Sequence, residues 1–61
     1  METKFIKVAS SDGKNWCLNV SQISSVNTDS IGRTVFHMVG SDIHITTNLK
    51  FDTVLAMLGV D

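Results

Sequence analysis

The sequence predicts an α+β fold: an antiparallel β-meander of four to five strands with one C-terminal α-helix packed on one face. The dipeptides Asp12-Gly13 and Gly40-Ser41 each separate two runs of β-prone residues, which is typical of a β-hairpin. No proline interrupts strand pairing. After residue 48 the spacing of apolar residues changes from two to the period of a helix. We expect residues 1–61 to form a single small domain.

The first hairpin is predicted from the faces that its side chains occupy. A two-residue loop, Asp12-Gly13, would place Ile6 and Trp16 on opposite faces, because side chains alternate with a period of two. A three-residue loop that begins at Ser11 places them on one face and puts Gly13 where a G1 bulge needs a left-handed residue. We therefore expect the longer loop. The predicted core face is Ile6, Val8, Trp16, Leu18 and Val20, and the opposite face is Phe5, Lys7, Ala9 and Cys17.

The middle of the chain has apolar residues three apart, which fits neither a regular strand nor a long helix. We expect a short helical turn at Val20–Gln22 and a short strand from Ile23 to Val26. The run from Asn27 to Gly32 has the composition of a turn.

The second hairpin is predicted over residues 33–46, with a two-residue Gly40-Ser41 turn. This loop makes Val39 oppose Asp42 and pairs His37 with His44. The register is favoured because a one-residue slip would expose half of the core residues. One face then carries Phe36, Met38, Ile43 and Ile45. The other carries Val35, His37, Val39, Asp42, His44 and Thr46.

The last element is predicted to be a helix from about Leu49 to Leu58. An apolar stripe at i, i+3, i+4 and i+7 defines it: Phe51, Val54, Leu55 and Leu58. We expect Thr47 or Asn48 to cap its N-terminus and Gly59 to follow its last turn. Asp52 in the first turns suits the helix dipole.

Composition restricts the classes of function. The net charge is −1, and the five Lys and Arg residues are spread along the chain. Because phosphate contacts supply most of the affinity of nucleic-acid binders, this pattern argues against nucleic acid. The N-terminal METKFIKV lacks the apolar region of a signal peptide, and no apolar run reaches the ~18 residues of a membrane span. We expect a cytoplasmic protein.

The small size of the domain predicts oligomerisation. A core of this size supplies only roughly 3–5 kcal/mol, and small domains usually add disulfides, a metal or a partner subunit. Cys17 is the only cysteine, so neither an internal disulfide nor a zinc cluster of cysteines can form. We expect no cofactor, and Cys17 is expected to be a small packed residue.

The two histidines are predicted to face each other across two strands. Their Cβ atoms should then lie about 4.5–5.5 Å apart, with Asp42 on the same face. Three interpretations follow: a metal site of His37, His44 and Asp42, a pH-sensitive contact, or a catalytic pair with Cys17. Two ligands make a weak metal site, and a small meander offers little concavity for a substrate. We expect no catalytic residues.

A second apolar face favours an interface. The helix covers one side of the sheet, and contiguous apolar area on the other side usually marks an interaction surface. The predicted interface residues are Phe5, Cys17, Val35, His37, Val39 and His44.

A family resemblance supports the same fold. The segments IKVASSDGKNWCLNVSQISSV, TVFHMVGSDIHI and FDTVLAMLG resemble the small flagellar FlbD-like (swarming motility) proteins. The likeness spans nearly the whole chain, and Leu18, Asn19, Ile23 and Val26 match the family's central segment. The chain also looks like the first half of LytTR-type DNA-binding domains. The resemblance implies a β-meander with a terminal helix and offers no catalytic residues.

Together these patterns predict a non-enzymatic protein–protein interaction module that forms a homo-oligomer and modulates a larger protein partner. One alternative is a small nucleic-acid-binding regulator of the LytTR-like type. Another is a metal-dependent protein that uses His37 and His44.

Overall fold

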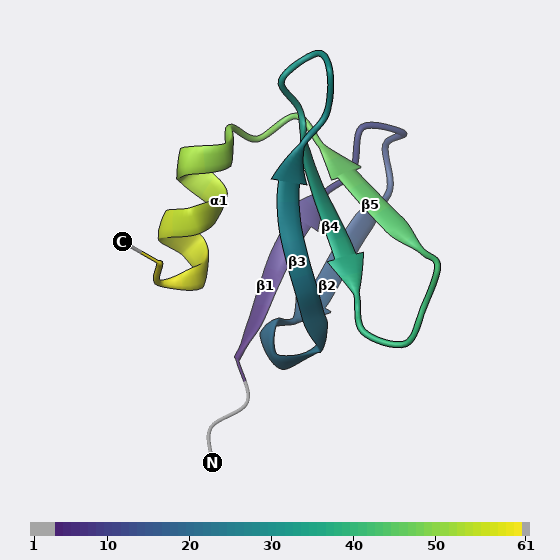
Figure 1. Cartoon of the computed structure of the whole chain (residues 1–61), viewed down its shortest axis with the longest axis vertical. Helices are drawn as coiled ribbons and strands as arrows, with labels where there is room; N and C mark the ends of the chain where they lie inside the picture. The colour runs from purple at the N-terminus through teal and green to yellow at the C-terminus, as the bar shows by residue number, and fades with distance from the viewer. Residues whose placement is uncertain (1–3, 61) are drawn as a thin grey trace.

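The computed structural model describes residues 4–60 and has five strands, a short 3-10 helix and one α-helix. The predicted α+β fold is confirmed: all strand pairs are antiparallel, and the α-helix is C-terminal (Figure 1). The elements are β1 (Phe5–Ala9), β2 (Asn15–Asn19), η1 (Val20–Gln22), β3 (Ile23–Thr28), β4 (Thr34–Met38), β5 (His44–Thr47) and α1 (Phe51–Leu58).

The strands form two sheets that enclose one core. The first sheet is β1–β2, and the second has the order β3–β4–β5. In Figure 1, β1 and β2 lie behind β3 and β4, and α1 lies to one side. The sheets meet where Ser10 bridges Thr47 and where the Ser11 N–H donates to the Thr46 carbonyl at 2.7 Å. The chain therefore wraps around its apolar residues instead of laying them on a single sheet.

The first hairpin has the predicted register and loop. Ile6 pairs with Leu18 and Val8 with Trp16. Gly13 has φ +91°, the left-handed conformation that the three-residue loop requires. The core face of this hairpin is confirmed for its buried members, while Trp16 is half-buried and packs against the core edge.

The segment after β2 follows the prediction and then extends beyond it. The helical turn at Val20–Gln22 is present as η1, and the Asn19 side-chain oxygen accepts from the Ser21 N–H at 3.1 Å. β3 continues to Thr28, two residues past the predicted end at Val26, and has a bulge between Ile23 and Ser25. The extension is possible because Asn27 and Thr28 pair with β4 before the chain turns.

The second hairpin has the predicted register, but the prediction of a two-residue Gly40-Ser41 turn was wrong. Val35 pairs with Thr46 and His37 with His44, after which pairing stops. The Val39 N–H donates to the Gln22 carbonyl at 2.7 Å, on the β3 side of the sheet. A two-residue turn would need the same N–H to bond to β5 instead, so the tight turn cannot form. Residues 39–43 form a wider loop, in which Ile43 is 55% exposed. Its predicted place in the core was therefore wrong.

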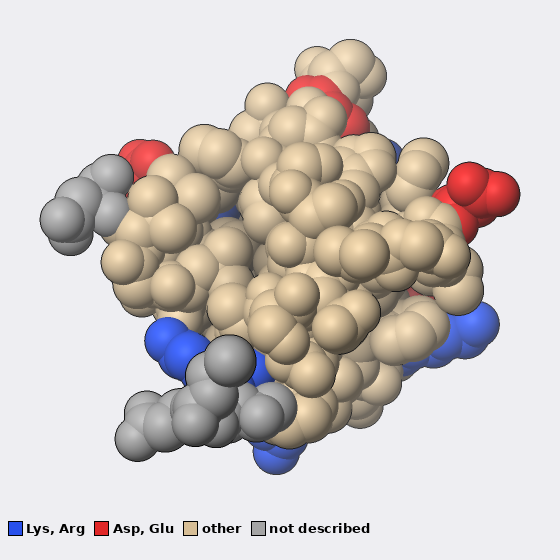
Figure 2. Space-filling model, turned by 60° about the horizontal axis from the view of Figure 1, so that its bottom comes forward, with Lys and Arg blue, Asp and Glu red and all other residues tan. Residues whose placement is uncertain are grey.

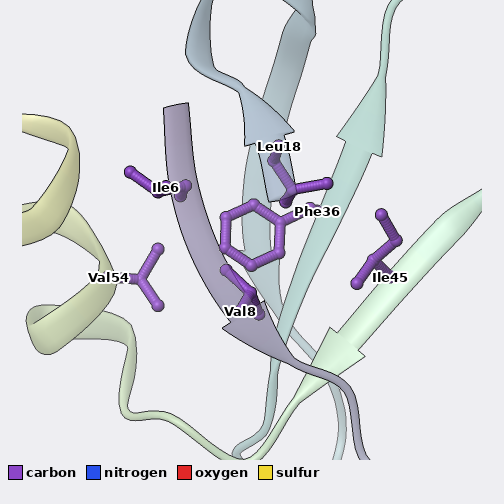
Figure 3. Packing of buried hydrophobic residues seen from close by; sticks show 6 residues of the cluster. All are labelled: Ile6, Val8, Leu18, Phe36, Ile45 and Val54. Carbon is purple, nitrogen blue, oxygen red and sulfur yellow. The ribbon is translucent and has the colours of Figure 1, made fainter. Parts of the chain in front are cut away.

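The core is small and contains side chains from both sheets and the helix. Figure 3 shows Phe36 at its centre, with Val54 approaching from α1. Phe36 and Val54 have no exposed surface. The buried apolar residues are Ile6, Val8, Leu18, Phe36, Ile45 and Val54.

The helix is shorter than predicted and begins differently. It starts at Phe51 after Lys50, and no side chain caps it. The predicted cap by Thr47 or Asn48 was wrong, because Lys50 is the residue that precedes the first turn, and the Thr47 hydroxyl oxygen accepts from the Leu49 N–H at 3.3 Å, before the helix begins. Gly59 ends the helix with φ +80°, as predicted. Between residues 4 and 60, no helix has the length and hydrophobicity that crossing a membrane requires.

Candidate functional site

The candidate site is the outer surface of the three-stranded sheet. The register places side chains of β3, β4 and β5 side by side in two rows, because directly paired residues point to the same face. We call these six residues the outer sheet face: Ser25, His37 and His44 in one row, and Asn27, Val35 and Thr46 in the next.

The two histidines form the centre of this face. Their ring centroids are 4.5 Å apart, and their planes meet at 63°. His37 is half-buried between its neighbours, whereas His44 is exposed. The predicted pairing of the two imidazoles is therefore present in the structure.

Asn27 orients one of the two rings. The His37 Nε2 atom lies 2.8 Å from Asn27 Oδ1. An amide oxygen only accepts hydrogen bonds, so Nε2–H is the donor, and the neutral ring keeps its lone pair on Nδ1. Asn27 thus fixes both the tautomer and the rotation of His37.

The outer sheet face has no carboxylate, ammonium or guanidinium group. Charged side chains lie elsewhere, and Arg33 is already paired with Asp29 at 2.8 Å in the β3–β4 turn. On the surface drawn in Figure 2, the blue and red groups are separated around a broad uncharged area. The basic residues therefore form no stripe on that surface that could follow a phosphate backbone.

The structure divides the predicted interface residues between the two sheets. Val35, His37 and His44 lie together on the outer sheet face, and Val39, 54% exposed, follows directly after β4. Phe5 and Cys17 lie on the outer surface of β1–β2. They are separated from the others because the two sheets face each other across the core.

Cys17 does not have the packed environment that the sequence suggested. Its side chain is exposed on β2. The two histidines belong to the other sheet, so the structure does not bring the thiol and an imidazole together as a nucleophile and base. The prediction that Cys17 is packed was wrong, because the Cys17 side chain points to the outer surface of β1–β2.

A small hollow lies beside His44, between β5 and the turn of the first hairpin. It has a volume of about 150 Å³. The carboxylate at its rim, Asp12, accepts hydrogen bonds from the Ser10 hydroxyl and the Lys14 N–H, and these lower the pKa of Asp12. The Asp12 carboxylate therefore stabilises the turn between β1 and β2 through these two hydrogen bonds. The lining residues are Ser10, Ser11, Asp12, Trp16, His44, Ile45 and Thr46.

The predicted three-residue metal site is not assembled. Within residues 4–60, no three His, Cys, Asp or Glu side chains come close enough to hold one ion. Asp42 lies in the exposed loop after β4 rather than on β5. The histidine pair thus stands without the carboxylate that the sequence placed beside it.

Two members of the outer sheet face were missed from the sequence. Ser25 and Asn27 follow the bulge in β3, and Asn27 was assigned to a turn. Their signal was the alternation of polar residues around Val26, whose side chain packs against the core.

Protein-family models, curated proteins and solved structures gave no match to this chain.

Proposed function

We propose that this chain is a non-enzymatic protein-interaction module that self-associates through its outer sheet face. The observation that carries the proposal is the absence of full charges from six neighbouring side chains on one sheet. Depletion of charged residues is the compositional signal of the centre of an interface.

A second copy of this chain suits that face because its groups are complementary to themselves. Hydroxyl, amide and imidazole groups donate and accept hydrogen bonds, so the face can pair with its own copy about a twofold axis. The half-buried Val35 supplies an apolar contact within the second row, between Asn27 and Thr46. Association would also add buried area to a core of only six buried apolar residues.

We also propose that the self-associated chain binds a larger protein and modulates it. The support for this is the separate outer surface of β1–β2, where the large apolar side chain of Phe5 is 55% exposed. That surface lies on the sheet opposite the proposed self-association face, so it stays open in a dimer.

The test is the molar mass in solution of the chain and of two charge variants, measured by sedimentation velocity across a range of concentrations. Val35→Glu places two like charges near the proposed axis, which costs several kcal/mol and should weaken association by about a hundredfold or more. Phe5→Lys is the matched control, because it adds a charge at an exposed strand position of the other sheet. A chain that is monomeric at every concentration contradicts the proposal, as does dissociation caused by Phe5→Lys alone.

A further inference from the structure

We propose that His37 and His44 of one chain bind a single divalent transition-metal ion of the Ni²⁺ or Cu²⁺ type. The proposal goes beyond self-association, because both protein ligands come from the same hairpin. It rests on three features of the pair: the distance between the rings, the orientation of His37, and access from solvent.

The distance between the rings fits one ion with two imidazoles at a right angle. With metal–nitrogen bonds of about 2.05 Å, the centre of each ring lies about 3.2 Å from the metal. Two ligands at a right angle then have centroids about 4.5 Å apart, and two at the tetrahedral angle about 5.2 Å. The observed separation is 4.5 Å, so ring nitrogens directed at one shared ion would meet it at about a right angle, the angle of the square-planar or octahedral geometry of Cu²⁺ and Ni²⁺.

The contact between His37 and Asn27 supplies the support that a metal-binding imidazole usually has. Histidine ligands generally donate their second ring N–H to an oxygen, which fixes the tautomer and makes the other nitrogen more basic. His37 Nε2 donates to Asn27 Oδ1 at 2.8 Å, so Nδ1 is the nitrogen left for the metal. Asn27 is thus a positioning residue of the proposed site.

Access favours binding without rearrangement of the fold. His44 is exposed and also lines the hollow that it shares with Trp16. In the single chain, water can occupy the remaining coordination positions, because the site opens to solvent. No carboxylate or thiolate gathers with the pair in the described part of the chain, so the proposed donor set is two neutral nitrogens plus water, which suits Ni²⁺ and Cu²⁺ more than Ca²⁺ or Mg²⁺.

The experiment uses the full chain without an affinity tag, in a Cys17→Ser background that removes the exposed thiol as a competing ligand. Titration calorimetry with NiCl₂ alone is expected to show one ion per chain. Quenching of Trp16, the only tryptophan, reports the same event because Trp16 and His44 line one hollow.

Variants separate the pair from other groups. Removal of a residue that only orients a ligand weakens metal binding by about tenfold. His37→Ala and His44→Ala each remove a ligand, so each should weaken Ni²⁺ binding by more than that. The matched control, His44→Ala with Thr53→His, keeps two histidines but moves one to the exposed side of α1, and it should bind as weakly as His44→Ala alone. Circular dichroism verifies that each variant is folded.

Asn27 has its own arm of the experiment. Asn27→Ala should weaken Ni²⁺ binding by about tenfold or more, whereas Asn27→Asp keeps an acceptor oxygen and should preserve it. No binding with Ni²⁺ in large excess, one ion per two chains, or equal affinity in His37→Ala and the parent would each overturn the proposal. These outcomes are distinguishable from a failure of self-association, because the proposed site needs only His37 and His44 of one chain, and binding is measured at a concentration at which sedimentation velocity shows the monomer.

Discussion

At the scale of single residues, Asp29 organises the turn that connects β3 to β4. Its Oδ1 accepts from the N–H groups of Ile31 and Arg33 at 3.1 and 2.8 Å, and its Oδ2 accepts from Arg33 Nε at 2.8 Å. Desolvation raises the pKa of Asp29, but the hydrogen bonds and the charge of Arg33 outweigh it, and the pKa is lowered. The carboxylate is therefore the form that the folded turn prefers.

Acidification should destabilise the protein partly through Asp29. A lowered pKa in the folded state means that its stabilising contribution is present above the ordinary carboxyl pKa of about 3.9 and is lost as the pH falls through the lowered value. Asp29→Asn should therefore show a smaller drop in Tm between pH 7 and pH 3 than the parent, measured by thermal circular dichroism. Asp12, whose pKa is also lowered, should account for part of the remaining drop. An unchanged pH dependence in Asp29→Asn would contradict this assignment.

At the scale of elements, α1 is held to the sheets mainly by Val54, its only fully buried residue. A helix of eight residues is too short to be stable in water without such packing. Phe51, Leu55 and Leu58 are half-buried around it. The predicted apolar stripe is therefore present, but Val54 is its only fully buried member.

Val54→Ala should destabilise the fold by about 2–3 kcal/mol, because it removes two buried methyl groups and leaves a cavity. This is a large part of the roughly 3–5 kcal/mol available to a core of this size. Urea unfolding followed by circular dichroism measures the loss. Thr53→Ala, on the exposed side of the same helix, should change the free energy of unfolding by no more than about 0.5 kcal/mol. Equal effects of the two substitutions would show that α1 is not docked through Val54.

Local patterns predicted the elements well, and contacts between distant segments account for the differences. Both hairpin registers follow from alternation, since a slip would expose apolar side chains such as Phe36. The wide loop after β4 depends on the bond from the Val39 N–H to the Gln22 carbonyl, seventeen residues earlier in the chain. Nothing near Gly40 signals that contact. For the same reason, the sequence paired His37 with His44 but could not place Phe5 and Cys17 on a different sheet.

At the scale of the whole molecule, two buried threonines join the separate parts of the fold. Thr34 and Thr47 pair directly across β4 and β5, and both are almost fully buried. The Thr47 hydroxyl donates to the Ala9 carbonyl of β1, and the Thr34 hydroxyl donates to the Leu49 carbonyl before α1, each at 2.8 Å. Two neighbouring hydroxyls thus attach the first sheet and the segment leading to the helix to the second sheet.

Thr47→Val should therefore loosen the junction between the sheets while keeping the side-chain volume. The change removes the part-buried hydrogen bond from the Thr47 hydroxyl to the Ala9 carbonyl, and the net loss of such a bond costs about 0.5–1.5 kcal/mol. The loss should appear in urea unfolding, and the Ser11 amide, which donates to Thr46 at this junction, should exchange with deuterium faster. Thr46→Val makes the same chemical change at the adjacent half-buried position on the outer sheet face, and it should cost no more than about 0.5 kcal/mol. If Thr47→Val is as stable as Thr46→Val and Ser11 exchange is unchanged, the sheets are held together by apolar packing alone.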